Sequence, residues 1–318
     1  MQTWHRSTTE AAKGKWRGIL IELGVPERSL GRKHGPCPLC GGKDRFRYDN
    51  KDGAGTYICN QCGAGNGMQL AMAYTKKPFN IIAKEIDAML GNGAFKPDTP
   101  KPDLSDQQRA AALREVASLT VKIKKDDLAD KYLTSRGVGE FAYYKTLRFA
   151  LALKDGEGHV RPCLVATVQG PDGANVSLHR TFLAPDGSGK AKMESPRKLM
   201  PGSIPQGSAI RLSDYTEGPL GIAEGIETAL SASALFSIPV WAAINANGLA
   251  QWIQPEGCDE VAIFADNDPK FAGQAAGFRL ANRLALAGVA VTVHIPAKVG
   301  TDWNDELLAR AKKGKSIG

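Results

Sequence analysis

The last third of the chain alternates short apolar runs with helical patterns. Four runs, at residues 220–223, 240–244, 261–265 and 290–295, are apolar and are separated by more polar segments. Runs of this length predict buried strands, and the patterns between them predict helices, one ending near residue 236 and one spanning 270–287. Strands that alternate with helices are typical of βαβ units. We therefore expect residues 216–318 to form an α/β domain with a mainly parallel four-stranded sheet flanked by helices.

The middle of the chain has a different pattern. Residues 106–135 have helical character, whereas residues 145–212 contain short strand patterns separated by Asp-Gly pairs at 155–156, 172–173 and 186–187. Asp-Gly favours the tight turns of β-hairpins, because glycine adopts positive φ without strain. We expect residues 106–215 to form a mixed α+β subdomain built on hairpins.

The first ninety residues contain four closely spaced cysteines between helical segments. Trp16, Ile19, Leu20 and Leu23 follow helical spacing, and residues 67–90 have the pattern of an amphipathic helix. Residues 91–105 contain three prolines and no periodicity, which is typical of a linker. The sequence thus predicts a multidomain α/β protein, with a small β ribbon and flanking helices at 1–90 and a linker at 91–105.

The cysteines have the spacing of a metal site. Cys37 and Cys40 form one Cys-x-x-Cys pair and Cys59 and Cys62 a second, with 18 residues between the pairs. In zinc sites of this spacing each pair supplies two thiolates from one tight turn. Four thiolates leave no open coordination position, so the predicted zinc ion is structural.

Basic and aromatic residues alternate between the two cysteine pairs. In a strand, Arg45 and Arg47 would share one face, and Phe46 and Tyr48 the other. Surfaces that bind single-stranded nucleic acid combine cations for phosphates with rings for bases, so we predict all four residues as contacts. The alternative is that Phe46 and Tyr48 pack the interior of the ribbon.

Composition and charge narrow the function classes. The 318 residues are 42% hydrophobic and 23% charged, which excludes a fibrous or wholly disordered chain and allows roughly two domains. Residues 1–90 carry 14 basic and 8 acidic side chains, residues 91–215 carry 19 and 14, and residues 216–318 carry 8 and 11. The net charge of +8 therefore resolves into a basic front and an acidic back. The excess of positive charge in residues 1–215 indicates a polyanionic partner.

The sequence predicts neither a membrane span nor a secretory signal. Residues 1–6 lack an apolar stretch, and the uncharged residues 228–255 are interrupted by Pro239 and diluted by polar side chains. We expect a cytoplasmic protein without a membrane partner.

Acidic residues follow three of the four strands predicted in the last third. Glu224 follows the first, Asp266 and Asp268 follow the third, and Asp302 and Asp305 come after the fourth. The carboxyl ends of parallel strands meet at one edge of a sheet, so we expect these side chains to converge. Clustered carboxylates require a cation, and their hard oxygen atoms suit Mg²⁺ or Mn²⁺. This pattern predicts a site for phosphoryl chemistry.

These acidic motifs carry a family resemblance. The sequences Glu224-Gly225, Asp266-Asn267-Asp268 and Asp302-Trp303-Asn304-Asp305 resemble the three motifs of the Toprim domain, which is shared by bacterial-type primases, type IA and II topoisomerases and some nucleases. The run from Glu224 to Leu230 is similar to the first motif in primases of phages and mobile elements. The cysteine ribbon resembles the zinc-binding domain that precedes the core of phage primases. Together the resemblance covers most of the chain.

The resemblance implies roles for the acidic residues. Glu224 would act as a general acid or base near the primer 3′-OH and would hold Mg²⁺ together with Asp266 and Asp268. Either Asp302 or Asp305 would complete the catalytic cluster, and a helix N-cap is the alternative role for Asp305.

One position departs from the family pattern. Bacterial primases often have an acidic residue four positions after the motif glutamate, where this chain has Thr228, with Glu227 before it. Glu227 is therefore expected to point away from the acidic cluster.

The segment before the acidic motifs is rich in cations. Seven Lys or Arg and three acidic residues lie between residues 161 and 211. By resemblance this segment is the basic part of the primase core and faces the Toprim acids. Cations there would offset the repulsion between carboxylates and triphosphate. The predicted contacts to template or nucleotide are Arg180, Lys190, Lys192, Arg197 and Lys198.

These observations predict a DNA primase of phage or mobile-element type in a bacterial or host cell. It would join NTPs into short RNA primers on single-stranded DNA, with catalytic Mg²⁺ or Mn²⁺ and one structural zinc. The sequence has no Gly-x4-Gly-Lys-Ser/Thr motif, so a separate replicative helicase is the expected partner. Two alternatives are a Toprim-type nuclease that uses the same acids and a non-enzymatic zinc-ribbon DNA-binding protein in replication or regulation.

Overall fold

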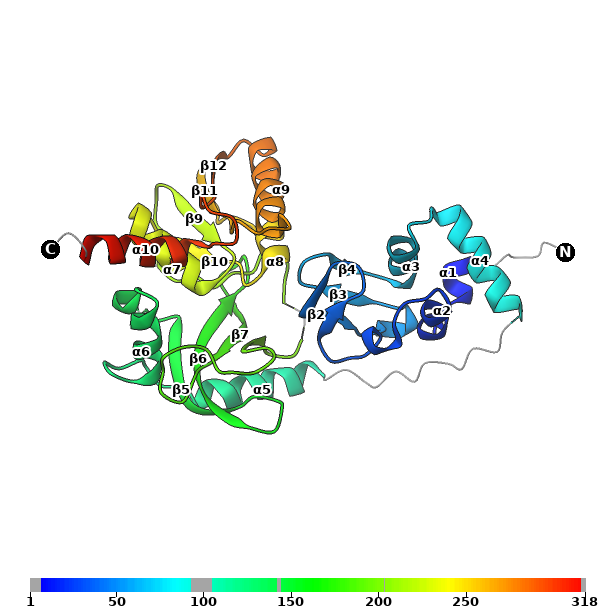
Figure 1. The fold of residues 1–318 in the computed structure, drawn as a ribbon, viewed down its shortest axis with the longest axis horizontal. Helices are drawn as coiled ribbons and strands as arrows, with labels where there is room; N and C mark the ends of the chain where they lie inside the picture. The colour runs from blue at the N-terminus through cyan, green and yellow to red at the C-terminus, as the bar shows by residue number, and fades with distance from the viewer. Residues whose placement is uncertain (1–6, 93–104, 142–143, 203, 316–318) are drawn as a thin grey trace. The chain divides into compact units, whose positions relative to one another are not determined.

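The structure is a computed structural model that describes residues 7–92, 105–141, 144–202 and 204–315 (Figure 1). Two compact units divide the chain, Met1–Asp103 and Leu104–Gly318, and each is described by itself. Most of the predicted linker, residues 93–104, lies outside the described residues, as do residues 1–6. Among the described residues, no helix combines the length and the apolar character that a membrane crossing requires.

The first unit places a small antiparallel sheet between helices. Its strands lie in the order β1-β2-β3-β4. The sheet contains β1 (Gly35–Cys37), β2 (Gly41–Tyr48), β3 (Tyr57–Cys59) and β4 (Gly63–Gly65). The helices are α1 (Thr8–Ala11), α2 (Trp16–Glu22), α3 (Gly67–Thr75) and α4 (Phe79–Asn92), with short 3-10 turns at Glu27–Ser29 and Lys51–Gly53. The helix predicted over 67–90 is two helices, because Lys76 adopts a φ of 58° and Pro78 cannot continue the helix.

Trp16 is the centre of the first unit's core. Its indole is fully buried, and the backbones of Gly55 and Gly67 lie against it. A Cβ on Gly67 would lie 2.1 Å from Trp16 Cδ2 and one on Gly55 2.6 Å from Cγ, so neither position has room for a side chain. This contact joins α2 to the start of α3, which follows the second cysteine pair and β4.

The second unit begins with helices and an antiparallel sheet. The strands follow the order β5-β6-β7-β8. They are β5 (Leu147–Lys154), β6 (Val160–Gln169), β7 (Asn175–Phe182) and β8 (Arg197–Leu199), preceded by α5 (Asp106–Ser118), α6 (Leu128–Ser135) and a 3-10 turn at Gly139–Phe141. The three Asp-Gly pairs all lie in hairpin turns, and Gly156, Gly173 and Gly187 have φ of 80°, 81° and 74°.

A parallel sheet completes the second unit. Its strand order, β10-β9-β11-β12, is that of βαβ crossovers. Apolar residues of α7 and α10 cover one face and those of α8 and α9 the other (Figure 1). The elements are β9 (Leu220–Ala223), α7 (Ile226–Phe236), β10 (Val240–Ala242), α8 (Ala246–Gln251), β11 (Glu260–Phe264), α9 (Ala272–Leu286), β12 (Ala290–His294) and α10 (Trp303–Lys315). The α/β class and the flanked parallel sheet predicted from the sequence are confirmed.

The two sheets of the second unit share one core. Ala209 bridges to Gln169 of β6, and the next residue, Ile210, bridges to Ala242 of β10. Leu164 and Phe149 of the antiparallel sheet belong to the same buried cluster as residues of α7 and β11. One face of the antiparallel sheet is therefore packed toward the parallel sheet.

Candidate active site and zinc centre

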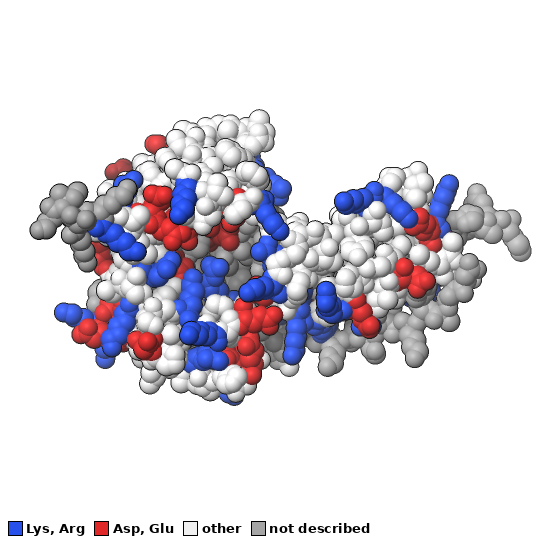
Figure 2. Space-filling view, in the orientation of Figure 1, with Lys and Arg blue, Asp and Glu red and all other residues white. Residues whose placement is uncertain are grey.

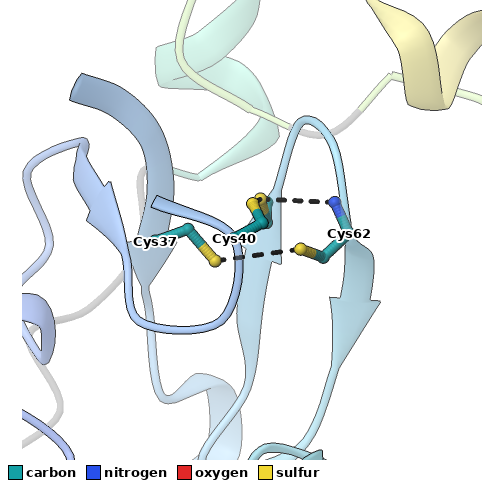
Figure 3. A group of neighbouring side chains, drawn as sticks. Cys37, Cys40 and Cys62 are labelled. Atoms are coloured by element: carbon teal, nitrogen blue, oxygen red, sulfur yellow. Dashed lines mark hydrogen bonds between the residues drawn. The ribbon is translucent and has the colours of Figure 1, made fainter. Parts of the chain in front are cut away.

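The four cysteines form a compact thiol cluster in the first unit. Their Sγ atoms all lie within 4.8 Å of one another. The Cys37–Cys62 and Cys40–Cys59 Sγ pairs are 3.9 and 3.7 Å apart, and Figure 3 shows Cys37 and Cys62 turned toward each other. Four sulfurs in a tetrahedron around zinc, with Zn–S bonds of about 2.3 Å, lie about 3.8 Å apart. The cluster therefore fits a structural Zn²⁺ held by all four predicted ligands.

Backbone geometry aims the thiols inward. In the first turn the Leu39 N–H donates to Cys37 Sγ at 3.4 Å, and in the second the Cys62 N–H donates to Cys59 Sγ at 3.3 Å. The glycines after the pairs, Gly41 and Gly63, have φ of 73° and 90°. Amide donors stabilise thiolate charge, and positive φ lets each turn close around a metal.

The ribbon aromatics are interior residues, which corrects one prediction. Phe46 and Tyr48 are 1% and 3% exposed, and the Phe46 ring stacks on Tyr57 at 5.4 Å. Rings buried in this way offer no face to a nucleic-acid base, so packing of the ribbon is their role here. Arg45 and Arg47 are half-buried on the opposite face, and Arg47 Nη2 lies 3.5 Å from Asp49 Oδ2.

The acidic residues after the parallel strands converge around Asp266. Burial raises the pKa of Asp266 to about 8, and the charges of Glu224, Asp302 and Asp268 add to that rise. Its Oδ1 atom is buried without a hydrogen-bond partner among the described residues. A buried carboxylate surrounded by like charges is stabilised by a cation, so this arrangement fits a hard divalent ion such as Mg²⁺. Among the described residues, only the four cysteines bring three or more donor atoms within 4.8 Å of one another, so the acidic side chains are spaced more widely than the thiols.

A hydrogen-bonded loop fixes Asp268 beside Asp266. Asp268 Oδ2 accepts from the Gly273 N–H at 2.8 Å, and the Gln274 amide donates to the Asn267 side chain at 2.8 Å. A Cβ on Gly273 would lie 2.7 Å from the Asp266 carbonyl oxygen, so α9 approaches the loop more closely than any other residue would allow. Gly273 and Gln274 were not predicted as site residues.

The two carboxylates of the last motif have different surroundings. The Asp305 N–H donates to Asp302 Oδ1 at 2.9 Å, and the Asp302 N–H donates to Asp305 Oδ2 at 3.1 Å. This reciprocal pair caps α10, with Asp302 as N-cap. Asp302 also acts on Asp266 through its charge, whereas Asp305 is exposed. The geometry therefore favours Asp302 for the cluster and a capping role for Asp305.

Strand alternation sorts the predicted basic contacts onto two faces of the antiparallel sheet. Arg197 pairs with Thr181, and Lys198 pairs with Arg180. Directly paired residues share a face, so Arg197 lies on the face packed toward the parallel sheet, and Arg180 and Lys198 lie on the other. The expectation that all of them face the acids is corrected for Arg180 and Lys198.

Arg180 and Lys198 have partners on their own face. The Arg180 guanidinium donates to the Leu199 carbonyl oxygen at 3.1 Å, and burial lowers its pKa. Lys198 Nζ donates to the Asp155 carbonyl oxygen at 2.8 Å and to Glu157 at 2.7 Å. Lys192 is exposed.

Arg197 joins the basic sheet to the acidic cluster. A Cβ on Gly225, the residue after Glu224, would lie 3.7 Å from Arg197 Nη1. The Arg197 charge also opposes the rise in the pKa of Asp266. Figure 2 shows acidic side chains gathered over the parallel-sheet part of this unit, with basic side chains next to them and both kinds over the antiparallel sheet. An arginine beside the acids provides a positive charge for a phosphate bound there.

Two buried polar residues near Arg197, Glu227 and His179, were not predicted as site residues. The Tyr132 hydroxyl of α6 donates to Glu227 of α7, and Lys190 Nζ lies 2.9 Å from Glu227 Oε1. His179 of β7 is 6% exposed, and burial, with help from the charge of Arg197, lowers its pKa to about 4. His179 is therefore neutral near pH 7.

Asn304 anchors the last motif to the rest of the unit. Its side chain is fully buried and donates to the Arg136 carbonyl oxygen at 2.6 Å and to Ser231 Oγ at 2.8 Å. Two residues before it, Asp302 is thereby held against α6 and α7. The sequence signal for this position was the motif Asp302-Trp303-Asn304-Asp305. The sequence did not indicate that Asn304 is the member with a structural role.

Three known domain families match consecutive parts of this chain. Residues 32–68 match the zinc-binding domain of primase-helicase, residues 107–212 a domain of unknown function, and residues 219–313 the Toprim domain. The first and last matches confirm the resemblances drawn from the cysteines and from the acidic motifs.

Solved primase structures are similar to the chain at low identity. The zinc-binding and RNA polymerase domains of the Aquifex aeolicus primase are 17% identical to it, with 99% of this chain and 85% of that chain covered and a TM-score of 0.43. The primase fragment of the bacteriophage T7 primase-helicase protein is 16% identical, with coverages of 88% and 96% and a TM-score of 0.39. The RNA polymerase domain of Mycobacterium tuberculosis primase is 17% identical, with coverages of 66% and 82% and a TM-score of 0.40.

Proposed function

We propose that this chain, which has a zinc-binding domain of the primase-helicase type followed by a Toprim domain, is a DNA primase. It would join NTPs into short RNA primers on a single-stranded DNA template. The observation that carries the proposal is the position of Arg197 beside an acidic cluster in the same compact unit. Nucleotidyl transfer needs this pairing, because the carboxylates hold a cation while the arginine neutralises phosphate charge.

The cation site would be made by Glu224, Asp266 and Asp268, with Asp302 next to them. Mg²⁺ or Mn²⁺ bound there would neutralise charge on the triphosphate during transfer. The unpartnered Asp266 Oδ1 supports a role as cation ligand. The hydrogen bond from the Gly273 N–H to Asp268 would keep that carboxylate in place when the cation is absent.

Protein side chains would perform the remaining steps. Glu224 would accept the proton of the primer 3′-OH, whose oxygen forms a bond to the α-phosphorus while the bond to the pyrophosphate oxygen breaks. Arg197 would bind phosphate oxygens of the incoming nucleotide. Glu224 directly follows β9 and Arg197 lies in β8, so the hydrogen-bonded backbones of two sheets would position both residues.

The zinc ribbon would contact the template. Arg45 and Arg47 lie on the outer face of β2, away from the buried Phe46, and provide charge for a DNA backbone. We further propose that the chain works together with a replicative helicase, whose nucleotide-binding P-loop is not found in these 318 residues.

The direct test is incorporation of radiolabelled NTPs on short single-stranded DNA templates. The wild-type chain should make template-dependent products with Mg²⁺ and none with EDTA. Asp266→Ala should lower incorporation by about 10²-fold or more, while template affinity measured by fluorescence anisotropy changes less than about threefold. Incorporation by Asp266→Ala at the wild-type rate would contradict the proposal. So would Mg²⁺-dependent cleavage of the template without NTP incorporation, which is the behaviour of a nuclease.

A further inference from the structure

Glu227 is a buried carboxylate outside the proposed cation site. It lies in the first turn of α7, is 6% exposed and is three residues after Glu224. Its carboxylate accepts a hydrogen bond from Tyr132 and forms an ion pair with Lys190 at 2.9 Å. Burial opposes its ionisation, yet the charges of Lys190 and Arg197 hold its pKa below the usual range. Glu227 is therefore a buried anion.

The cationic partners of Glu227 come from the antiparallel part of the unit. Lys190 lies in the hairpin after β7, where it pairs with Leu183, and Arg197 lies in β8. Glu227 Oε2 and Arg197 Nη1 are 3.8 and 3.7 Å from the Cβ position of Gly225. The carboxylate thus lies among the cations that border the site, whereas Glu224, Asp268 and Asp302 act together on Asp266.

A buried ion pair is a poor source of stability. Taking two charges out of water offsets most of their attraction, so apolar residues of the same size often give an equally stable protein. What such a pair does supply is geometry. A lysine has a flexible stem and three N–H donors, and one carboxylate contact fixes the ammonium while other donors stay available.

From this placement we infer that Glu227 is a positioning residue, which holds Lys190 where it binds the triphosphate of the incoming nucleotide. The inference rests on the proposed function. Lys190 keeps 30% of its side chain exposed, so its pairing with Glu227 does not bury it completely. Fixing the ammonium before binding lowers the entropy lost when phosphate binds.

The test uses nucleotide binding and primer synthesis by the full chain. Fluorescent N-methylanthraniloyl-ATP is the binding probe, measured by anisotropy with Mg²⁺. Glu227→Gln keeps the shape and the contact with Tyr132 but removes the charge. We expect the Kd for the probe and the KM for NTP to rise about tenfold, with kcat changed less than about threefold. The Mg²⁺ concentration that gives half-maximal synthesis should stay unchanged.

A double-mutant cycle identifies the residue through which Glu227 acts. Lys190→Met should weaken probe binding on its own. In that background, Glu227→Gln should change the Kd less than about twofold, because the group that it positions is gone. Glu227→Asp keeps the charge but has a shorter side chain, so the Kd for the probe should rise less than in Glu227→Gln. It replaces Glu227→Gln as the test variant if that variant does not fold.

A matched control separates positioning from stability. Ser233→Ala removes the hydrogen bond that Ser233 Oγ donates to the Ile238 carbonyl oxygen, near the C-terminal end of the same helix. It should lower the melting temperature without changing the Kd.

Three results would overturn the inference: an unchanged or lower Kd in both Glu227 variants, the same rise in the Lys190→Met background, or a shifted Mg²⁺ requirement with normal probe affinity. If the wild-type chain binds the probe with this pattern but makes no primers, the proposed function fails and the positioning role stands.

Discussion

At the residue scale, each carboxylate of the site is defined by its neighbours. Asp266 is buried among like charges and lacks a hydrogen-bond partner at Oδ1 among the described residues, whereas Glu227 is buried among cations. Asp302 and Asp305 each donate a backbone N–H to the other's carboxylate at the start of α10. Acidic residues that look alike in the sequence therefore support different tasks.

The Asp302–Asp305 pair allows a prediction at this scale. Asp305→Ala should lower the free energy of unfolding by about 0.5–1 kcal/mol, because half of the capping box is lost, and should leave NTP incorporation within about twofold. Asp302→Ala removes the other half of the same box and should lower incorporation by about 10²-fold as well. Urea denaturation and the incorporation assay, run on both variants, measure the two effects. A larger loss of activity in Asp305→Ala would reverse the assignment.

Sequence alone predicted the acidic residues, because each follows a recognisable strand. It could not predict the role of Glu227, whose partner Tyr132 is 95 positions away in the chain. A single acid in the first turn of a helix looks like a favourable but exposed charge. Only the tertiary packing of α6 and α7 buries it.

At the element scale, the strand and helix periodicities predicted the parallel sheet closely, and the Asp-Gly turns predicted the hairpins. The faces of the antiparallel strands were not predictable, because three residues of β8 give too short a pattern to show which side is buried. The buried face of β2 was not predictable either, for a different reason. Its alternation of basic and aromatic residues was clear, but either face could have been the interior. Burial of Phe46 and Tyr48 resolves that choice.

The close approach of α9 to the cation loop allows a second prediction. Gly273→Ala places a Cβ 2.7 Å from the Asp266 carbonyl oxygen, so the helix or the loop must move. We expect a loss of about 1–3 kcal/mol in the free energy of unfolding together with a clear loss of NTP incorporation.

Gly91→Ala is the control, since none of the described residues places an atom within 4 Å of a Cβ there. It should change stability by less than about 0.5 kcal/mol. Equal effects of the two substitutions would contradict the packing argument.

The ribbon allows a third prediction, on metal removal. Cys40→Ser should reduce zinc measured by mass spectrometry from one ion per chain to little or none, because three thiolates leave the shell incomplete. Hydrogen exchange in β1–β4 should then accelerate, while β9–β12 in the other compact unit keep their protection. Cys163→Ser, which alters a buried cysteine outside the cluster, should retain the zinc. Zinc retained in Cys40→Ser would contradict four-cysteine ligation.

At the scale of the whole molecule, the structure shows where the basic and the acidic segments of the chain lie. The basic segment of residues 161–211 and the acidic segment belong to one compact unit with a shared core, and the charge of Arg197 acts on Asp266. Charge patterning in the sequence indicated a basic front and an acidic back, but only the fold shows that Arg197 is the residue beside Glu224 and Asp266. We propose that this one face of the antiparallel sheet and the acidic cluster form a single site.

Arg197 and Lys198 test that claim most directly, because these adjacent cations of β8 lie on opposite faces of the sheet. Template-directed NTP incorporation should be measured for Arg197→Ala and Lys198→Ala, with melting temperatures recorded for both. If the face and the acids form one site, NTP incorporation should fall by about 10²-fold or more for Arg197→Ala and by less than about threefold for Lys198→Ala. Equal losses, or a greater loss in Lys198→Ala, would contradict it.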